Sequence, residues 1–395
     1  MTLRASKPSF NVREKLTELA VKFGLKGSEL AKAETVQDAR DLVSAGRKNM
    51  IINGDMRISQ RATSVSASNN SYNTLDRWNT WINYNSGGVT MSQASAAPPG
   101  FYKSLQFYNN GNATTPQYHF VEQKIEAQNI PQLKMGTSDA EYMTLSFWVR
   151  SSRTGTFNVE FSDDDGSHHA VKKYTINNAA TWEYKTITIP PATNTGVPTY
   201  DNTVGLTVHW WLAGSGSYNG TSADGTWQTY STTRRNDGGN TTFTDPDYWN
   251  ITGVQLEVGK NATDFEHRPY GEELALCQRY YQKIYYNTSD YPFGYCYTYN
   301  VSASACVVPL VTSMRGEASS IDVVNCNIRG SNQDGVNNGY TVTSHTYATD
   351  NGITKGLCQL NLGHNSVNST NIGSASILTN GVNNATSYIA IDAEL

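Results

Sequence analysis

Apolar and polar residues alternate along most of the chain between residues 49 and 270. The clearest run covers residues 143–150, where Leu145, Phe147 and Val149 share one side. A period of two is typical of a β-strand with one buried face. Similar runs, bounded by Gly, Pro or Asp turn signals, occupy residues 157–161, 187–189, 206–212 and 254–258. Many short strands without a long helical pattern predict a β-sandwich of the jelly-roll type.

Two short amphipathic helices are predicted in residues 1–48. Their apolar positions recur at helical spacing, and each helix is followed by a glycine, the usual residue after a helix end. These positions are Val12, Leu16, Leu19, Phe23, Val36, Leu42 and Val43. Isolated helices of this length are marginal in water, so their apolar faces need a partner. We therefore interpret residues 1–48 as an arm that docks onto another protein.

A linking helix is predicted over residues 271–287. Glu272 and Glu273 stand in its first turn and Lys283 in its last, the charge order that the helix dipole favours. Its apolar face consists of Leu276, Cys277, Tyr280, Tyr281 and Ile284. Residues 288–395 then return to strand alternation with few large apolar side chains, which predicts a distal β-sandwich. A small sandwich with a weak core is marginal alone, so we expect a homotrimer to complete it.

The composition fits a mainly β fold and excludes several functions. Charged residues make up 16% of the 395 residues, and 24 Tyr and 32 Gly suit β structure with many turns. Residues 1–48 hold 10 Lys and Arg against 6 Asp and Glu, whereas the rest holds 20 against 28. The basic arm has no dense positive block with interleaved aromatic residues, so we predict no nucleic-acid partner. No apolar stretch is long enough to predict membrane insertion.

No catalytic or metal-binding motif is apparent in the sequence. The five cysteines are Cys277, Cys296, Cys306, Cys326 and Cys358. They lack metal-ligand spacing, and we predict buried free thiols in a protein that folds in a reducing cytoplasm. The Asp-rich residues 163–166 lack the spacing of a calcium loop and predict a hairpin turn. Without a nucleophile, zinc-protease or phosphate-loop motif, we predict no enzyme activity, cofactor or metal.

Aromatic and polar residues on outer strand faces are the candidate glycan-binding residues. They are Trp148, Arg150, His209 and Trp211 in the sandwich, and Tyr295, Tyr297 and Tyr299 in the distal domain. Aromatic rings can stack on sugars while polar groups bind their hydroxyls. The alternative is that a loop or a neighbouring subunit covers these side chains. The long polar loop of residues 215–247 is itself predicted to be functional or interfacial.

Several segments resemble parts of known bacteriophage proteins. The segment NMIINGDMRISQR (residues 49–61), followed by LDRW (residues 75–78), resembles the opening of a jelly-roll, carbohydrate-binding-module-like domain. GVQLEVGKNATDFEHRPYGEELALCQRYYQK (residues 253–283) resembles the segment that closes it. Such domains occur in many tail-fibre and other virion proteins of tailed bacteriophages. ACVVPLVTSMRG (residues 305–316) and the ending SYIAIDAEL resemble the distal domain of the same fibre-like proteins.

This resemblance implies a structural virion protein, a tail fibre. Residues 1–48 would attach it to a tail adaptor or tail tube, and residues 49–270 would form the jelly roll. After the linking helix (271–287), residues 288–395 would be a receptor-binding tip that recognises host-surface polysaccharide as a homotrimer. The protein would be made in the host cytoplasm and located on the phage tail. The alternatives are a head or neck decoration protein without a ligand, and a glycan-degrading tail enzyme.

Overall fold

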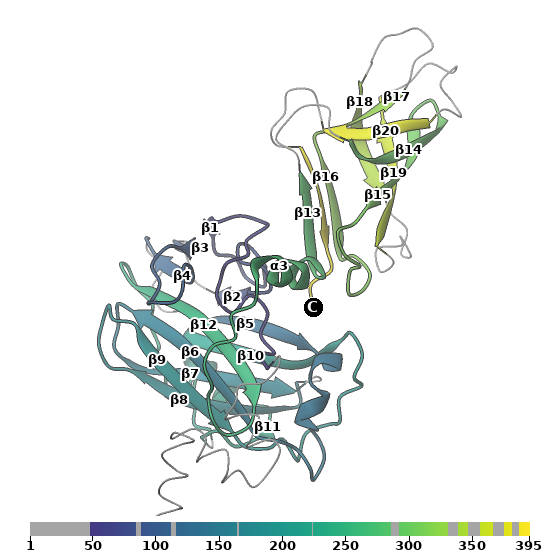
Figure 1. The fold of residues 1–395 in the computed structure, drawn as a ribbon. Coiled ribbons are helices and arrows are strands. Elements are labelled where there is room, and N and C mark those ends of the chain that lie inside the picture. Colours follow the sequence, from purple (N-terminus) through teal and green to yellow (C-terminus); the bar gives the residue numbers. More distant parts are fainter. Residues whose placement is uncertain are drawn as a thin grey trace, which may run out of the picture.

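The computed structural model describes residues 48–83, 88–111, 116–163, 166–222, 224–285, 292–330, 339–346, 356–365, 375–380 and 387–395. They form a β-sandwich and a distal β-barrel, joined through one short helix and a three-stranded sheet (Figure 1). The predicted mainly β fold is confirmed. The arm of residues 1–48 lies outside the described residues except for Lys48.

The sandwich consists of two six-stranded antiparallel sheets. Sheet 1 has the order β1 (Ser64–Ser66), β3 (Val89–Ala94), β4 (Ser104–Asn109), β12 (Tyr248–Val258), β6 (Met143–Ser151) and β9 (Glu183–Ile189). Sheet 2 has the order β11 (Gln228–Thr229), β8 (His168–Ile176), β7 (Gly155–Asp163), β10 (Val204–Gly214), β5 (Tyr118–Glu126) and β2 (Asn79–Asn83). Strands β7 and β8 pair as neighbours in sequence, as the predicted hairpin requires, and the Gly166 amide lies 3.1 Å from the Asp163 carbonyl, while residues 164 and 165 lie outside the described residues.

The core between the sheets consists of the inward residues of both. Phe147 and Val149 of sheet 1 and Trp210 of sheet 2 are completely buried, as the alternation of their strands predicts. Burial of each large apolar side chain contributes about 1.5–3 kcal/mol. Strand β12 carries a bulge at Gly253, whose φ is +62°, and the Phe101 ring packs where a Cβ would lie. The two sheets thus form a rigid frame whose outer faces carry the remaining aromatic residues.

The linking helix is shorter than predicted. Helix α3 covers Tyr270–Gln278, and strand β13 covers Tyr281–Tyr285, so the prediction of a helix over residues 271–287 is wrong for residues 281–285, while residues 286 and 287 lie outside the described residues. Its apolar positions fit a helical face, but β13 instead pairs along its length with β21 (Tyr388–Asp392). A distant strand therefore decides the local structure here, a tertiary effect that helical spacing does not reveal.

The distal strands close into a barrel rather than the predicted sandwich. The barrel order is β14 (Pro292–Asn300), β15 (Ala303–Pro309), β19 (Leu357–His364), β18 (Gly339–Thr346), β17 (Cys326–Gly330) and β20 (Ala375–Asn380). Strands β13, β21 and β16 (Ser320–Val324) form the sheet between barrel and sandwich (Figure 1). Val308, Leu360 and Leu378 belong to a buried core that one chain supplies. The homotrimer expected to complete this core stays a prediction.

Acidic residues near the end of the sequence link the distal domain to the sandwich. Glu394 pairs with the guanidinium of Arg77, which is completely buried and stacks over the Tyr280 ring at 3.5 Å. Arg61 lies 2.8 Å from Asp392 and 3.4 Å from Glu394. We call the residues Arg61, Arg77, Tyr280, Tyr281, Asp392 and Glu394 the joint. It holds together segments that are more than 300 residues apart in the sequence.

Backbone groups complete this connection. Arg315 donates to the carbonyls of Ala393 at 2.7 Å and Glu394 at 3.0 Å, and to the carbonyl of Asn202 in the sandwich at 2.7 Å. Lys124 donates to the Leu395 carbonyl at 3.0 Å. These contacts hold Arg315 and the residues that follow β21 against the sandwich.

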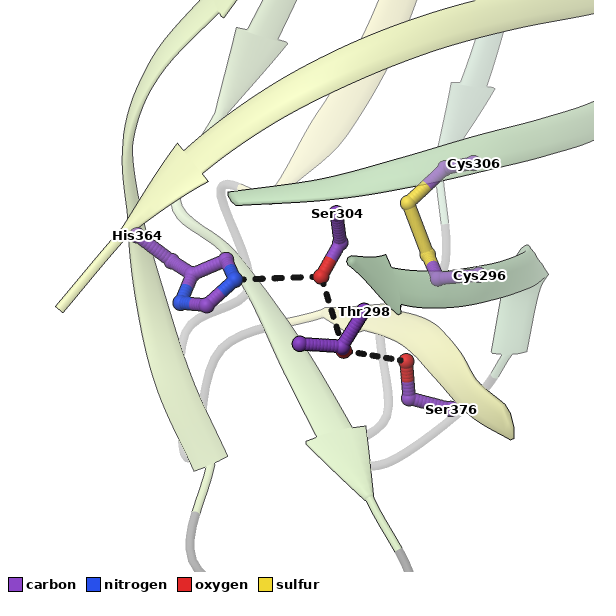
Figure 2. The surroundings of a disulfide bond; sticks show 6 residues. All are labelled: Cys296, Thr298, Ser304, Cys306, His364 and Ser376. Carbon is purple, nitrogen blue, oxygen red and sulfur yellow. Dashed lines mark hydrogen bonds between the residues drawn. A yellow bond between two sulfur atoms is a disulfide. The ribbon is translucent and has the colours of Figure 1, made fainter. Parts of the chain in front are cut away.

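The barrel contains a disulfide bond that the sequence did not predict. Cys296 and Cys306 stand opposite each other on β14 and β15 and are bonded (Figure 2). The prediction of free thiols is therefore wrong for these two and confirmed for Cys277, Cys326 and Cys358, which are buried and unpaired. The sequence spacing gave no sign of the pair, because only strand register brings it together. The thiol-based argument for folding in a reducing compartment is thereby removed.

Removal of this disulfide is expected to destabilise the barrel. The bond joins residues separated by 10 in sequence, and closing a loop of that size contributes about 2–3 kcal/mol. We expect the Cys296→Ser/Cys306→Ser variant to lose about this free energy of unfolding in urea titrations. Reductant should destabilise the wild type similarly and leave the variant unchanged. An unfolding midpoint that reductant does not shift in the wild type would contradict the prediction.

Candidate functional site

The four sandwich residues predicted to bind glycan lie on two opposite outer faces. Trp148 and Arg150 extend from β6 in sheet 1, whereas His209 and Trp211 extend from β10 in sheet 2. The core fills the space between these sheets. One sugar therefore cannot contact all four side chains, and each face has to be judged separately.

The outer face of sheet 2 is covered by the loop of residues 215–247. Trp211 is completely buried and His209 nearly so, although neither belongs to the core. The guanidinium of Arg235, from this loop, lies 4.9 Å from the Trp211 ring centre and 4.8 Å from that of Phe120. Its Nε is 2.8 Å from the Glu160 carboxylate. The alternative that a loop covers these residues is thus confirmed for Trp211, and we call this region the covered face.

Two carboxylates that sequence reasoning missed organise the covered face. Glu160 accepts a hydrogen bond from the Trp211 indole at 3.0 Å and lies 2.9 Å from the His169 ring. Glu122 accepts from the Trp81 indole at 2.9 Å and lies 2.9 Å from the ring of His209. Both glutamates occupy outward strand positions, where alternation predicts solvent exposure. Their burial depends on contacts between distant segments, among them the loop of residues 215–247. The sequence next to each glutamate gives no sign of these contacts.

Both carboxylates are held in the ionised form. Burial alone would raise the pKa of Glu160, but Arg235, His209 and His169 together outweigh it and the pKa is lowered. Burial would also raise the pKa of Glu122, but its interactions, chiefly the hydrogen bond with His209, have the larger effect. The pKa of Glu122 is therefore lowered as well. A general acid needs a raised pKa and a proton within reach of the substrate. The covered face therefore has the character of a structural cluster, and within the described residues no group of His, Cys, Asp and Glu could hold a metal ion.

The outer face of sheet 1 is open around Trp148 and Arg150, both half-buried. The Trp148 ring lies 5.4 Å from that of Tyr184 on β9. Arg150 lies over the Tyr248 ring at 5.1 Å, and Tyr108 stands opposite Tyr248 on β4. The sequence analysis did not single out these three tyrosines, although the alternation of their strands places all of them on the outer face.

The predicted tyrosines of the distal domain form an exposed row on β14. Tyr295, Tyr297 and Tyr299 are 76%, 54% and 45% exposed, while the residues between them point into the barrel. We call these three side chains the tyrosine row. The neighbouring β15 strand adds Val307, opposite Tyr295 and also exposed. Aromatic rings this exposed gain little from burial, so their number on one strand points to a contact surface.

The barrel interior next to the disulfide holds a buried polar chain (Figure 2). The His364 ring lies 3.0 Å from the Ser304 hydroxyl, which is 2.9 Å from that of Thr298. Ser376 continues the chain at 3.4 Å from Thr298. All of these side chains are buried. The serine and histidine satisfy each other inside the barrel wall, where a substrate has no access, so they serve the fold.

The predicted virion-docking residues lie outside the described residues. These are Val12, Leu16, Leu19, Phe23, Val36, Leu42 and Val43. Their role therefore stays a prediction from the sequence. None of the helices that the structure describes is long and apolar enough to span a membrane.

Comparison with known proteins gives only partial structural likeness. No family model and no curated protein matches the sequence. The enzymatically active domain of tailspike protein 4 from bacteriophage CBA120 superposes with a TM-score of 0.30 and 14% identity, covering 53% of this chain and 21% of the tailspike. A putative sugar-binding protein from Bacteroides thetaiotaomicron VPI-5482 superposes with a TM-score of 0.32 and 13% identity, covering 53% of this chain and 100% of that protein.

The carbohydrate-binding module TmCBM61, solved with β-1,4-galactotriose, gives a TM-score of 0.29 and 11% identity over 54% of this chain and 99% of the module. Scores at this level describe a partial superposition. They assign neither a ligand nor an activity to this chain.

Proposed function

We propose that this chain is a non-enzymatic tail-fibre protein of a tailed bacteriophage that recognises host-surface polysaccharide. The tyrosine row carries the proposal, because three aromatic side chains from one strand remain in solvent on the barrel, which the three-stranded sheet separates from the sandwich (Figure 1). Exposed tyrosines combine an apolar ring with a hydroxyl that can both donate and accept, which suits a sugar ring with its hydroxyl groups.

Weak contacts would gain strength by repetition. A single row of stacked rings supplies only a few kcal/mol, but a homotrimer and several fibres per particle raise the effective concentration of the remaining sites. The joint supports this mechanism, because it ties the distal domain of each copy to its sandwich. The arm of residues 1–48 would attach the fibre to a tail adaptor or tail tube, and the protein would be made in the host cytoplasm.

Binding without cleavage is favoured by the state of the buried carboxylates. Glu122 and Glu160 are ionised, hydrogen-bonded and covered, so they are poorly suited to act as the acid and base of a glycosidase. A glycan-degrading tail enzyme would need other groups. A decoration protein without a ligand would leave the tyrosine row without a role.

The test is binding of the full chain to extracted surface polysaccharides from a panel of bacteria. We expect at least one polysaccharide to bind, with its chain length unchanged by size-exclusion chromatography after long incubation. Tyr295→Ser/Tyr297→Ser should weaken binding roughly tenfold to a hundredfold, because two ring contacts are lost. Both side chains are exposed, so the variant should keep the wild-type unfolding midpoint.

Tyr102→Ser is the matched control, because Tyr102 is 79% exposed but lies in the sandwich away from the row. It should bind as the wild type does. Shortening of the polysaccharide would establish the enzyme alternative. Binding to none of the panel, with folded protein, would favour the decoration protein.

A further inference from the structure

The open part of sheet 1 forms a platform with a charge at its centre. The rings of Trp148 and Tyr184 pack together, and Tyr248 and Tyr108 stand opposite each other on neighbouring strands, so we call each couple an aromatic pair. Arg150 lies between the two pairs, on the strand of Trp148 and over the ring of Tyr248. We call these five residues the platform. Tyr184 is 45% exposed and Tyr108 is 37% exposed, so a ligand can reach both ends.

The limits of the platform are set by the chain itself. Beyond the bulge at Gly253, the face is occupied by Phe101, whose ring packs on that glycine and lies 5.1 Å from Phe265. Gln255 on the same strand is bonded to the backbone of Thr263 and Asp264. The segment after β12 therefore covers one half of the outer face. The other half, which carries the platform, stays exposed. From the rise per strand residue and the spacing between strands, the two aromatic pairs lie roughly 14 Å apart.

Arg150 makes no ion pair with any carboxylate among the described residues. Its Nε donates to the Ala180 carbonyl at 3.0 Å, which orients the guanidinium without neutralising it. Two other arginines of the sandwich do have such a partner: Arg153 lies 2.5 Å from Asp247, and Arg235 lies 2.8 Å from Glu160. A guanidinium that is oriented by a backbone carbonyl, flanked by aromatic rings and lacking an acidic partner is prepared for an anion.

We propose that the platform binds an acidic polysaccharide, with a sugar carboxylate on Arg150 and pyranose rings stacked on the aromatic pairs. The distance between the pairs suits a short stretch of an extended glycan. The amide of Gln106, on the platform strand β4 next to Asn250, supplies a further polar contact for hydroxyl groups. This inference rests on the proposed glycan recognition and adds a second site, of stated charge, on the sandwich rather than on the barrel.

The experiment measures binding of the full chain to oligogalacturonate, to the same oligosaccharide with its carboxyl groups reduced, and to dextran. We expect the wild type to bind oligogalacturonate, to bind the reduced form at least tenfold more weakly, and to lose affinity as salt is raised. Arg150→Gln should abolish the preference for the acidic form, and Arg150→Lys should retain part of it, because the charge remains while the planar fork is lost. Arg150 is half-buried, so both variants should unfold at the wild-type midpoint.

Arg234→Gln is the matched control, since Arg234 also lacks a carboxylate partner among the described residues but lies on the loop over sheet 2. It should behave as the wild type does. Equal binding of acidic and reduced sugars, or an unchanged preference in Arg150→Gln, would overturn the inference. Loss of the preference in Tyr295→Ser/Tyr297→Ser instead would place the acidic site on the barrel and also overturn it. If binding of a bacterial polysaccharide depended only on the tyrosine row, the second site would be rejected. The proposed function would still hold.

Discussion

Replacement of Arg77 by alanine is expected to lower the free energy of unfolding by about 3–5 kcal/mol, because the buried carboxylate of Glu394 then loses its shortest ion pair and keeps only Arg61, at 3.4 Å. The same change removes the guanidinium that stacks on the Tyr280 ring and donates to the Lys124 carbonyl. Urea titration followed by tryptophan fluorescence measures the loss. Small-angle scattering should also show a larger radius of gyration, since the distal domain loses a main contact with the sandwich.

Two further variants distinguish the loss of the buried pair in the joint from the loss of a charge at any position. Arg77→Met/Glu394→Leu replaces the buried pair by apolar side chains of similar volume and should recover most of the stability. Lys134→Ala removes an ion pair with Glu141 that lies in solvent, and no measurable change is expected. A loss below about 1 kcal/mol in Arg77→Ala would show that the joint does not hold the two domains together.

Replacement of Glu160 by alanine is the second large effect, with an expected loss of about 3–5 kcal/mol. The carboxylate is completely buried, and its removal leaves the Arg235 guanidinium, the Trp211 indole and the His169 ring without their acceptor. The loop of residues 215–247 should then detach from sheet 2, which limited proteolysis within the loop would detect. Glu160→Leu/Arg235→Met, which removes both charges, should restore most of the stability.

This prediction also separates a structural role of the covered face from a role in binding. At a temperature where Glu160→Ala is still folded, we expect its affinity for polysaccharide to equal that of the wild type. A variant with wild-type stability but no glycan binding would make Glu160 a ligand-binding residue and contradict the interpretation of this face.

The strands could be predicted because their signal is local. Alternation along residues 143–150 and 206–212 identified the core residues Phe147 and Trp210, which the structure buries. The same alternation placed Trp148 and Trp211 outside the core. It could not tell that one is open and the other covered, because Arg235 is brought onto Trp211 by a loop that folds back over the sheet.

The features that the sequence did not predict all depend on contacts between distant segments. The second half of the linking helix becomes β13 because it pairs with β21. The disulfide depends on the register of β14 and β15. The joint brings together Arg77 of the LDRW segment, Tyr280 of the segment of residues 253–283, and Glu394 of the ending SYIAIDAEL. The segments that carried the resemblance therefore meet at the joint, and their residues there support the domain connection rather than the glycan surfaces.

The joint also changes how the domains can be tested. A truncation that removes the barrel removes Glu394 and Asp392 with it, and so leaves Arg77 and Arg61 of the sandwich without their partners. If such a truncated protein failed to adsorb to the host, the cause could be a damaged sandwich as well as a missing receptor site. Point variants of exposed residues on the full chain avoid this ambiguity.

A crystal structure of the full chain with the tightest-binding oligosaccharide would test most directly that glycan recognition uses exposed aromatic side chains of the barrel. We expect a sugar ring in van der Waals contact with the rings of Tyr295 and Tyr297, and the loop of residues 215–247 unchanged over Trp211. A sugar bound against Trp211, with Arg235 displaced from Glu160, would contradict this, because the covered face would then be the binding site.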